Sequence, residues 1–339
     1  MGSVATEGIG KGGSLLLGRR TYEDFAAFWP NQTDDNPFTA VMNNFQKSVE
    51  VTFGSTIRLQ AILSFGMPGR AMVVSPRRAI GGRQQARAGR RYAAGFMTDA
   101  AKTAAKIEAA LKRTGSPERA VGEKRYLKSD LAFLGSALGD MRRLARSIAE
   151  SSPMGHDGVI ALVQELWSKP LFERRMVAVI LLEIHAYELG PKDLPFIEEL
   201  IRASKTWALV DGLAGDVVSE VALHHGIKRK LDRWAKDDDF WIRRSSLLAE
   251  LEPLKHGAPF EPFADRADAM LGETEFFIRK AIGWVLREAS KTRPHEVYGW
   301  IAPRTDRASG VTMREAVKYL DAKHAARLMR AYKAGRPAR

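Results

Sequence analysis

Three stretches of the chain decide its fold, and they read SKTWALVDGLAGDVV (Ser204–Val218), DDFWIRRSSLLAEL (Asp238–Leu251) and EFFIRKAIGWVLREASKTRP (Glu275–Pro294). In each, an aromatic residue opens an amphipathic helical pattern. The same helix start recurs five times, at intervals of 35, 34, 36 and 35 residues. We call the first residues of these starts the lead residues, and they are Phe172, Trp207, Trp241, Phe277 and Thr312. A fixed period of this length indicates stacked helical repeats.

The rest of the sequence from residue 97 onward agrees with that interpretation. Amphipathic patterns cover residues 99–114 and 194–204, and glycine or proline separates successive patterns. No segment with the alternating apolar pattern of a strand interrupts them. We therefore expect residues 97–339 to form an all-α, HEAT-like α-solenoid in which each helix pair buries its apolar face against its neighbours.

The beginning of the chain has a different character. Leu15–Leu17 is a short apolar run typical of a buried strand, Gly18 permits a turn, and Thr21 can cap a helix. The stretch from Leu15 to Asn44 resembles the dihydrofolate-reductase-like family that includes the RibD C-terminal domain. The resemblance implies that Gly18, Arg19 and Thr21 would lie beside NADPH. It stops near Lys47, so we expect residues 1–50 to be a truncated reductase-like fragment without reductase activity.

Residues 51–96 form the second predicted region. Between Val51 and Ala94 there are eight arginines and neither a lysine nor an acidic residue. Sustained periodicity is lacking, so we expect either a divergent linker or an out-of-frame remnant, and the whole N-terminal part to be a short α/β fragment or a poorly ordered segment. The domain prediction is thus residues 1–50, 51–96 and 97–339.

Composition excludes several classes of protein. The chain has 339 residues and no cysteine, which removes disulfides, thiolate metal sites and iron–sulfur clusters, and fits a reducing cytoplasm. We expect no membrane span and no signal peptide, because no long uncharged stretch is present. The seven histidines are scattered, so we expect no metal and no cofactor.

The net charge of +13 suggests a polyanionic partner. Basic residues follow the lead residue in several repeats, and stacking of the repeats would align them into a column. Such a column suits a phosphate backbone, but a solvated face with compensating acids is an equal alternative. The column would hold Arg174, Arg175, Arg243, Arg244, Arg279, Lys280 and, in part, Arg314.

Two residues break the repeat pattern. Four positions after the lead, the other repeats carry small or apolar residues or methionine, whereas the Trp207 repeat carries Asp211. A carboxylate at a core position costs several kcal/mol, on the order of 3–5, unless it is paired or used. Seven positions after the lead, Trp284 replaces an aliphatic residue. Trp207, Asp211 and Trp284 would form an acidic, aromatic pocket. Alternatively, Asp211 pairs with Lys205 or Arg244, and the tryptophans belong to the core.

The three stretches quoted first are similar to the AlkD-type DNA alkylation repair family, over about 240 residues. The resemblance implies a HEAT-repeat DNA glycosylase that excises cationic alkylpurines without full base flipping. It places the catalytic W-x-x-x-D motif on Trp207 and Asp211, a second aromatic wall on Trp284, and DNA contacts on Arg244 and on Tyr126. Ala137, Leu138 and Gly139 depart from the more polar residues of some relatives, which leaves the DNA contacts of that corner open.

The leading hypothesis is therefore a monofunctional glycosylase that releases 3-methyladenine and 7-methylguanine from double-stranded DNA. Asp211, Trp207 and Trp284 would be its catalytic residues, and Arg244, Arg243, Arg175, Lys280 and Tyr126 its DNA-binding residues. We expect a cytoplasmic monomer. The alternative is a non-catalytic HEAT scaffold that binds DNA or protein. An NADPH-dependent reductase is a third class, and it rests only on residues 15–44.

Overall fold

The computed structural model describes the backbone of residues 14–17, 46–53 and 57–63, and residues 99–335 apart from Pro153. By their internal contacts, residues 1–79 and residues 80–339 form two separate units.

The first unit contains a small sheet with the strand order β1-β2-β3. Strand β1 (Ser14–Leu17) pairs in parallel with β2 (Gln46–Phe53), which pairs antiparallel with β3 (Ile57–Leu63). The strand predicted at Leu15–Leu17 is thus present. Gly18, Arg19 and Thr21, the residues of the reductase resemblance, lie outside the described residues.

Strands also occur in the segment from residue 51, for which the sequence showed no sustained periodicity. Strand β3 and the end of β2 lie there. The sequence IRLQAIL of β3 alternates apolar and polar residues from Ile57 to Ala61, which is the period of a strand. The arginine-rich composition of the longer segment obscured this short pattern. The division of the chain at residues 50 and 96 stays a prediction.

The second unit is helical throughout its regular elements. It begins with a helix over residues 99–114. The elements that follow are α4 (Pro117–Leu127), α5 (Leu138–Ser151), α6 (His156–Trp167), α7 (Phe172–Ile184), η3 (Ala186–Glu188), η4 (Pro191–Asp193), α8 (Leu194–Ala203), α9 (Trp207–Asp211), η5 (Gly212–Val218), α10 (Ser219–His225), α11 (Lys228–Trp234), α12 (Phe240–Leu248), α13 (Leu251–Lys255), α14 (Glu261–Met270), α15 (Phe276–Ala289), α16 (Pro294–Ile301), η6 (Ala302–Arg304), α17 (Gly310–Ala316) and α18 (Ala322–Ala334).

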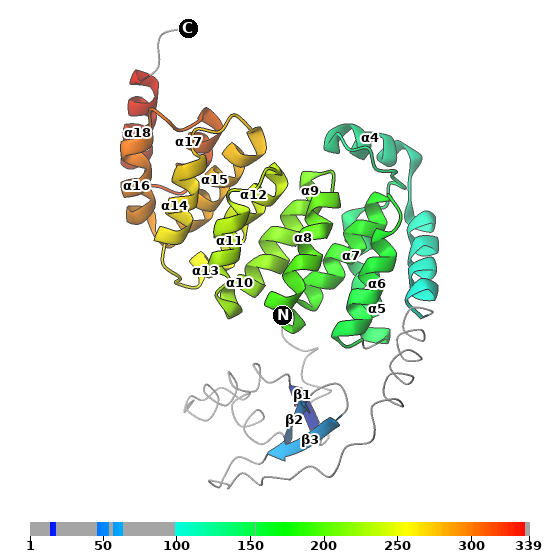
Figure 1. Ribbon diagram of the computed structural model, residues 1–339. Helices are drawn as coiled ribbons and strands as arrows, with labels where there is room; N and C mark the ends of the chain where they lie inside the picture. Colours follow the sequence, from blue (N-terminus) through cyan, green and yellow to red (C-terminus); the bar gives the residue numbers. More distant parts are fainter. Residues whose placement is uncertain (1–13, 18–45, 54–56, 64–98, 153, 336–339) are drawn as a thin grey trace, which may run out of the picture. The chain divides into compact units, whose positions relative to one another are not determined.

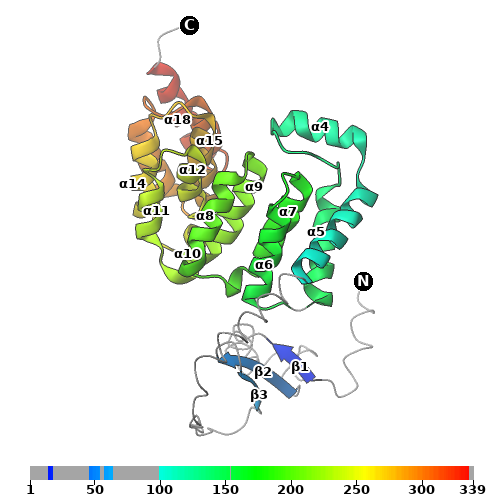
Figure 2. The ribbon, with the colours of Figure 1, turned by 45° about the vertical axis from the view of Figure 1, so that its right-hand side comes forward.

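These helices form an array of pairs, as Figures 1 and 2 show. Every lead residue lies in the first turns of one helix of a pair, and these helices pack on one another in sequence order: α5 on α7, α7 on η5, η5 on α12, α12 on α15, and α15 on α17. We call this series the lead row. Helices α6, α8, α11, α14 and α16 alternate with it along the chain. The predicted all-α solenoid of helical repeats is confirmed.

Local sequence explains where several lead helices begin. The side chains of Asp239, Glu275 and Ser309 accept hydrogen bonds from backbone N–H groups of the first turn of α12, α15 and α17. Such N-caps satisfy donors that have no partner inside the helix. They set the register of these three helices, and so they fix which of their residues face the neighbouring repeat.

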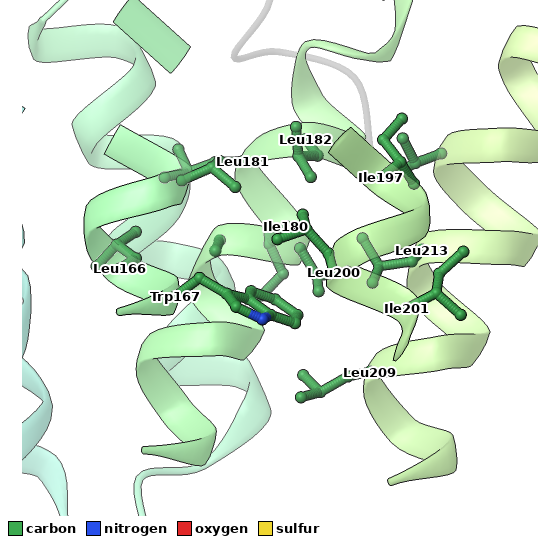
Figure 3. Packing of buried hydrophobic residues seen from close by; sticks show 14 of the residues in the cluster. Leu166, Trp167, Ile180, Leu181, Leu182, Ile197, Leu200, Ile201, Leu209 and Leu213 are labelled. Carbon is green, nitrogen blue, oxygen red and sulfur yellow. The ribbon is translucent and has the colours of Figure 1, made fainter. Parts of the chain in front are cut away.

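Apolar side chains of neighbouring helices are buried between repeats, as Figure 3 shows for part of the first cluster. Leu166 and Trp167 of α6, Ile180 of α7, and Ile197 and Ile201 of α8 all belong to one buried cluster. A second cluster covers α14 to α18 and includes Leu247 and Leu248 of α12. Among the described residues, no helix has the length and apolar character that crossing a bilayer requires.

Segment η5 is a π-helix that begins directly after Asp211. A methyl group on Gly212 would lie 2.6 Å from Cγ1 of Val179, so only glycine allows α7 to approach this closely. Single π-helical turns inside longer helices are rare and frequently mark functional sites. Here the turn separates Asp211 from the continuation of its helix in α10.

Candidate active site and nucleic-acid interface

Asp211 is held by two parallel hydrogen bonds from one arginine. Nε of Arg244 lies 2.8 Å from Oδ1 of Asp211, and Nη2 of Arg244 lies 2.9 Å from Oδ2. Arg244 comes from α12, the next helix of the lead row, and its Nη1 donates to the backbone carbonyl of Phe277 on α15. The Arg244 side chain is 2% exposed and that of Asp211 is 15% exposed. This pair therefore joins three consecutive repeats.

The environment of Asp211 acts on its charge in two opposite ways. Burial raises the pKa of the carboxyl, because a low-dielectric surrounding disfavours the ionised form. The positive charge and hydrogen bonds of Arg244 lower that pKa, and the net result remains a raised value. Of the two alternative partners considered from sequence, the structure has Arg244. Lys205 instead lies just before α9 with a left-handed backbone conformation, φ 55°.

The two tryptophans lie on different helices of the lead row. Trp207 opens α9, one helical turn before Asp211, and packs partly buried against the first core cluster. The ring of Tyr126 on α4 meets it edge to face, with 5.8 Å between centroids. Tyr126 is 72% exposed, so its ring is open to a ligand. Trp284 is partly buried on α15, which packs against α12.

Two arginines of the predicted column, Arg174 and Arg175, are engaged inside the protein. Arg174 is 1% exposed and binds the carbonyls of Glu165 and Leu166 at the end of α6. Arg175 is 8% exposed and donates to the carbonyl of Ala203, 2.6 Å away, at the end of α8. Burial lowers the pKa of Arg175. Neither side chain lies on a solvated face, so the alternative of a solvated face does not apply to these two arginines.

Arg243 and Lys280 have acidic partners. Arg243 contacts both carboxylate oxygens of Glu273, at 3.0 and 2.9 Å, and its pKa is raised mainly by this hydrogen bonding. Lys280 Nζ lies 2.6 Å from Glu315. The basic side chains after the lead residues thus tie successive repeats together. The assignment of DNA contacts to Arg175, Arg243, Arg244 and Lys280 stays a prediction.

Other cations, which the sequence reasoning did not single out, are better placed to meet a ligand. Lys124, Arg125 and Lys128 lie at the end of α4, beside Tyr126, and all three are exposed. None of them forms a hydrogen bond or ion pair with another residue of the described ranges. Their spacing around an exposed tyrosine was the signal available in KRYLK.

Asp216 is the second carboxylate near the site. It follows Asp211 by five residues on the π-helix, and its side chain is exposed. Although the residue has solvent access, surrounding protein atoms partly desolvate its carboxyl. This desolvation, together with the negative charges of Glu183, Glu252 and Asp211, raises its pKa to about 6, while Arg142 opposes the shift. No group of His, Cys, Asp and Glu that could hold a metal ion occurs within the described part of the chain.

Comparison with known proteins agrees with this architecture. The family model of the DNA alkylation repair enzymes matches residues 107–320. A solved structure described as a predicted DNA alkylation repair enzyme from Enterococcus faecalis is similar to the chain with 25% sequence identity and a TM-score of 0.55, covering 62% of this chain and 98% of the other. AlkD2 from Streptococcus mutans has 18% identity and a TM-score of 0.43, over 61% of this chain and 100% of its own.

No curated protein matches the sequence significantly. The family match covers more than half of the chain, and it includes every lead helix from α7 to α17. It confirms the family predicted from the three stretches around Trp207, Trp241 and Phe277. The chain belongs to the DNA alkylation repair enzyme family.

Proposed function

We propose that the chain is a monofunctional DNA glycosylase that hydrolyses the N-glycosidic bond of cationic alkylated purines in duplex DNA. The observation that carries this proposal is a largely buried carboxylate, Asp211, held in one orientation by a buried arginine and adjoined by an aromatic residue one turn earlier. A structural repeat protein has no need of an acid at this position, where the other repeats carry small or apolar residues or methionine.

The chemistry follows from the charges. A purine alkylated at N3 or N7 is already cationic, so the electrons of the breaking C1′–N bond neutralise the ring as it leaves and no strong acid is required. The sugar develops oxocarbenium character, which a fixed negative charge stabilises. Water then adds to C1′ and releases one proton to the solvent. Asp211 would stabilise the sugar and orient this water.

The orientation of Asp211 is the contribution of Arg244. Two parallel hydrogen bonds fix the plane of the carboxylate, and preorganised charge of this kind costs no rearrangement during the reaction. The faces of Trp207 and Trp284 would attract the cationic nucleotide, at about 0.5–2 kcal/mol for each ring. Tyr126, edge-on to Trp207, would extend the same aromatic surface.

One observation favours the second candidate, a non-catalytic HEAT scaffold that binds DNA. Both carboxylate oxygens of Asp211 accept hydrogen bonds from Arg244, which is also how a purely structural tie between repeats would look. A scaffold would bind DNA with strong salt dependence and release no base.

A comparison of two carboxylate variants tests the proposal. Single-turnover release of 3-methyladenine and 7-methylguanine from methylated duplex is measured for the wild type, Asp211→Asn and Asp216→Asn. Loss of the fixed charge in Asp211→Asn should slow release by about 100-fold or more. Asp216→Asn, a change of the same kind five residues away, should alter the rate by no more than a few-fold.

Folding of both variants is checked by circular dichroism and thermal melting. Full activity of folded Asp211→Asn would overturn the mechanism, and absence of base release from the wild type would leave the scaffold. A monomeric state and a cytoplasmic location are part of the same proposal. We propose no reductase activity.

A further inference from the structure

The last helix, α18, carries a row of cations that the proposed site does not use. Lys323, Arg327 and Arg330 are spaced by four and three residues, so they share one face of the helix. No acidic residue occurs between Ala322 and the end of the chain. The row is therefore unusual in a protein whose other basic helix faces mostly carry acids as well.

The opposite face of α18 is packed. Leu328 is buried in the second core cluster, and Ala325, Met329 and Tyr332 pack against that cluster. The ring of His324 lies 4.2 Å from that of Tyr298 on α16. Because these contacts hold the apolar face, the cationic face is presented in a fixed orientation.

The three cations themselves are exposed and available. Among the described residues, none forms a hydrogen bond or an ion pair with the side chain of Lys323, Arg327 or Arg330. They contrast with Arg174 and Arg175, whose donors are used up within the protein. A free guanidinium or ammonium group is what phosphate contact requires.

The position of α18 relates it to the lead row. A methyl group on Gly310, at the start of α17, would lie 2.8 Å from the hydroxyl of Tyr332, so the second half of α18 reaches the N-terminal end of the last lead helix. The starts of successive lead helices also meet, since the rings of Trp241 and Phe277 lie 4.8 Å apart. The second half of α18 therefore lies beside the N-terminal end of α17. This end of α17 is equivalent to the N-terminal end of α9, where Trp207 lies.

We propose that Lys323, Arg327 and Arg330 form a second binding surface for the phosphates of duplex DNA, outside the lesion site. The inference rests on DNA being the partner in the proposed function. From Lys323 to Arg330 the helix rises about 10 Å, at roughly 1.5 Å per residue. Phosphates follow one another at roughly 3.4 Å of axis per strand, so the row spans several of them. The surface lies beyond the family match, which ends at residue 320.

The distance between the lesion site and α18 determines the length of duplex that can contact both. The lead row takes three packed steps from α9 to α17, through α12 and α15, and packed helices lie about 8–10 Å apart. Helix α18 adds a fourth step, since Tyr332 reaches the start of α17. The surface would thus lie on the order of 35 Å from Trp207, or roughly ten base pairs at 3.4 Å each. A duplex of about 30 base pairs extends far enough to reach it from the site.

The experiment compares two triple variants on undamaged 30-base-pair duplex, so that catalysis plays no part. The first is Lys323→Gln/Arg327→Gln/Arg330→Gln. The matched control is Arg229→Gln/Arg233→Gln/Lys236→Gln, which has the same spacing and the same change in charge. Its three residues are exposed and lie on α11 and in the turn just after it, outside the lead row. The dissociation constant is measured at several salt concentrations, and folding is checked by thermal melting.

Loss of the three α18 contacts should flatten the slope of log K against log salt by about 2–3 units. It should also weaken binding at low salt by roughly tenfold or more, while the control stays within a few-fold of the wild type. An unchanged slope for the α18 variant, or an equal loss in the control, would overturn the inference.

Two further measurements separate other outcomes. Vesicles containing phosphatidylserine are mixed with the same proteins, and loss of vesicle binding without loss of DNA binding would assign the surface to membranes and overturn the inference. The α18 variant should still release base at saturating DNA. If the wild type releases no base but the α18 variant loses DNA affinity, the proposed function fails and this surface stands.

Discussion

Arg175 and Arg244 occupy the same position of two repeats, three residues after the lead, yet they do different things. Both are buried, and both donate to a backbone carbonyl of the following repeat, Ala203 for Arg175 and Phe277 for Arg244. Arg175 meets only carbonyls and the ring of Trp167. Arg244 also holds the carboxylate of Asp211 in the preceding repeat.

The difference shows how a repeat array can gain a reactive group with few changes. The arginine is part of the tie between repeats, and only the acid is new. A charged pair in the interior gives little net stability, because desolvation offsets the attraction. The burial of Asp211 is therefore better explained by use of its charge than by stability.

The sharpest test of this comparison replaces each arginine with glutamine. Arg244→Gln leaves Asp211 buried without its counter-ion, and should lower the free energy of unfolding by about 3–5 kcal/mol. Arg175→Gln leaves no opposite charge without its partner, so the free energy of unfolding should fall by only about 1–3 kcal/mol, because hydrogen bonds are lost. Urea unfolding of both variants measures the two values, and equal losses would show that the acid adds nothing to the role of Arg244.

The pH dependence of base release tests the same pair more finely. The carboxylate is the active form, and the pKa of Asp211 is raised above the usual 3.8 for an aspartate. As the pH is lowered, the rate of base release should therefore fall with a midpoint above the usual pKa of an aspartate. In Arg244→Gln the opposing charge is gone, so the acid limb should move to higher pH. Single-turnover rates between about pH 4.5 and 8, where carboxyl groups of raised pKa titrate, give the acid limb of the wild type and that of Arg244→Gln.

Asp216→Asn is the control for this profile, because the pKa of Asp216 is raised to about 6 and could produce a limb of its own. If the acid limb of the rate profile disappears in Asp216→Asn but remains unshifted in Arg244→Gln, the titrating group is Asp216.

The smallest expected effect concerns Asp216 alone. Its pKa is raised in the folded state, so the protonated form favours folding, and this contribution is lost as the pH rises through about 6. Asparagine resembles the protonated form. Asp216→Asn should therefore melt slightly higher than the wild type at pH 8, by at most about 2 °C, and the gain should vanish near pH 3.5, below the usual aspartate value. A gain that is equal at both pH values would contradict the shift.

The fold could be predicted from the sequence because the helix starts recur with a regular period. Asp211 could be singled out because it departs from that period. Asp211 stood out against the residues at equivalent places, and its pairing with Arg244 was one of two alternatives. The burial of Arg174 and Arg175 could not be predicted, because spacing places a residue on a helix face without saying which carbonyls lie within its reach. Strand β3 was missed because five alternating residues, Ile57 to Ala61, are few against a long arginine-rich background.

The reach of Arg244 has a consequence for the folding of the molecule. One of the two buried clusters extends from the first helix to Ala249, and the other runs from Ala214 to Leu328. Asp211 lies on a helix of the first cluster and Phe277 on a helix of the second, and Arg244 binds both. Repeat arrays can open from one end while the rest stays folded. An array that has lost its C-terminal repeats would lose one anchor of Arg244, so a partly opened molecule would hold its carboxylate less firmly and be a poorer catalyst before it unfolds.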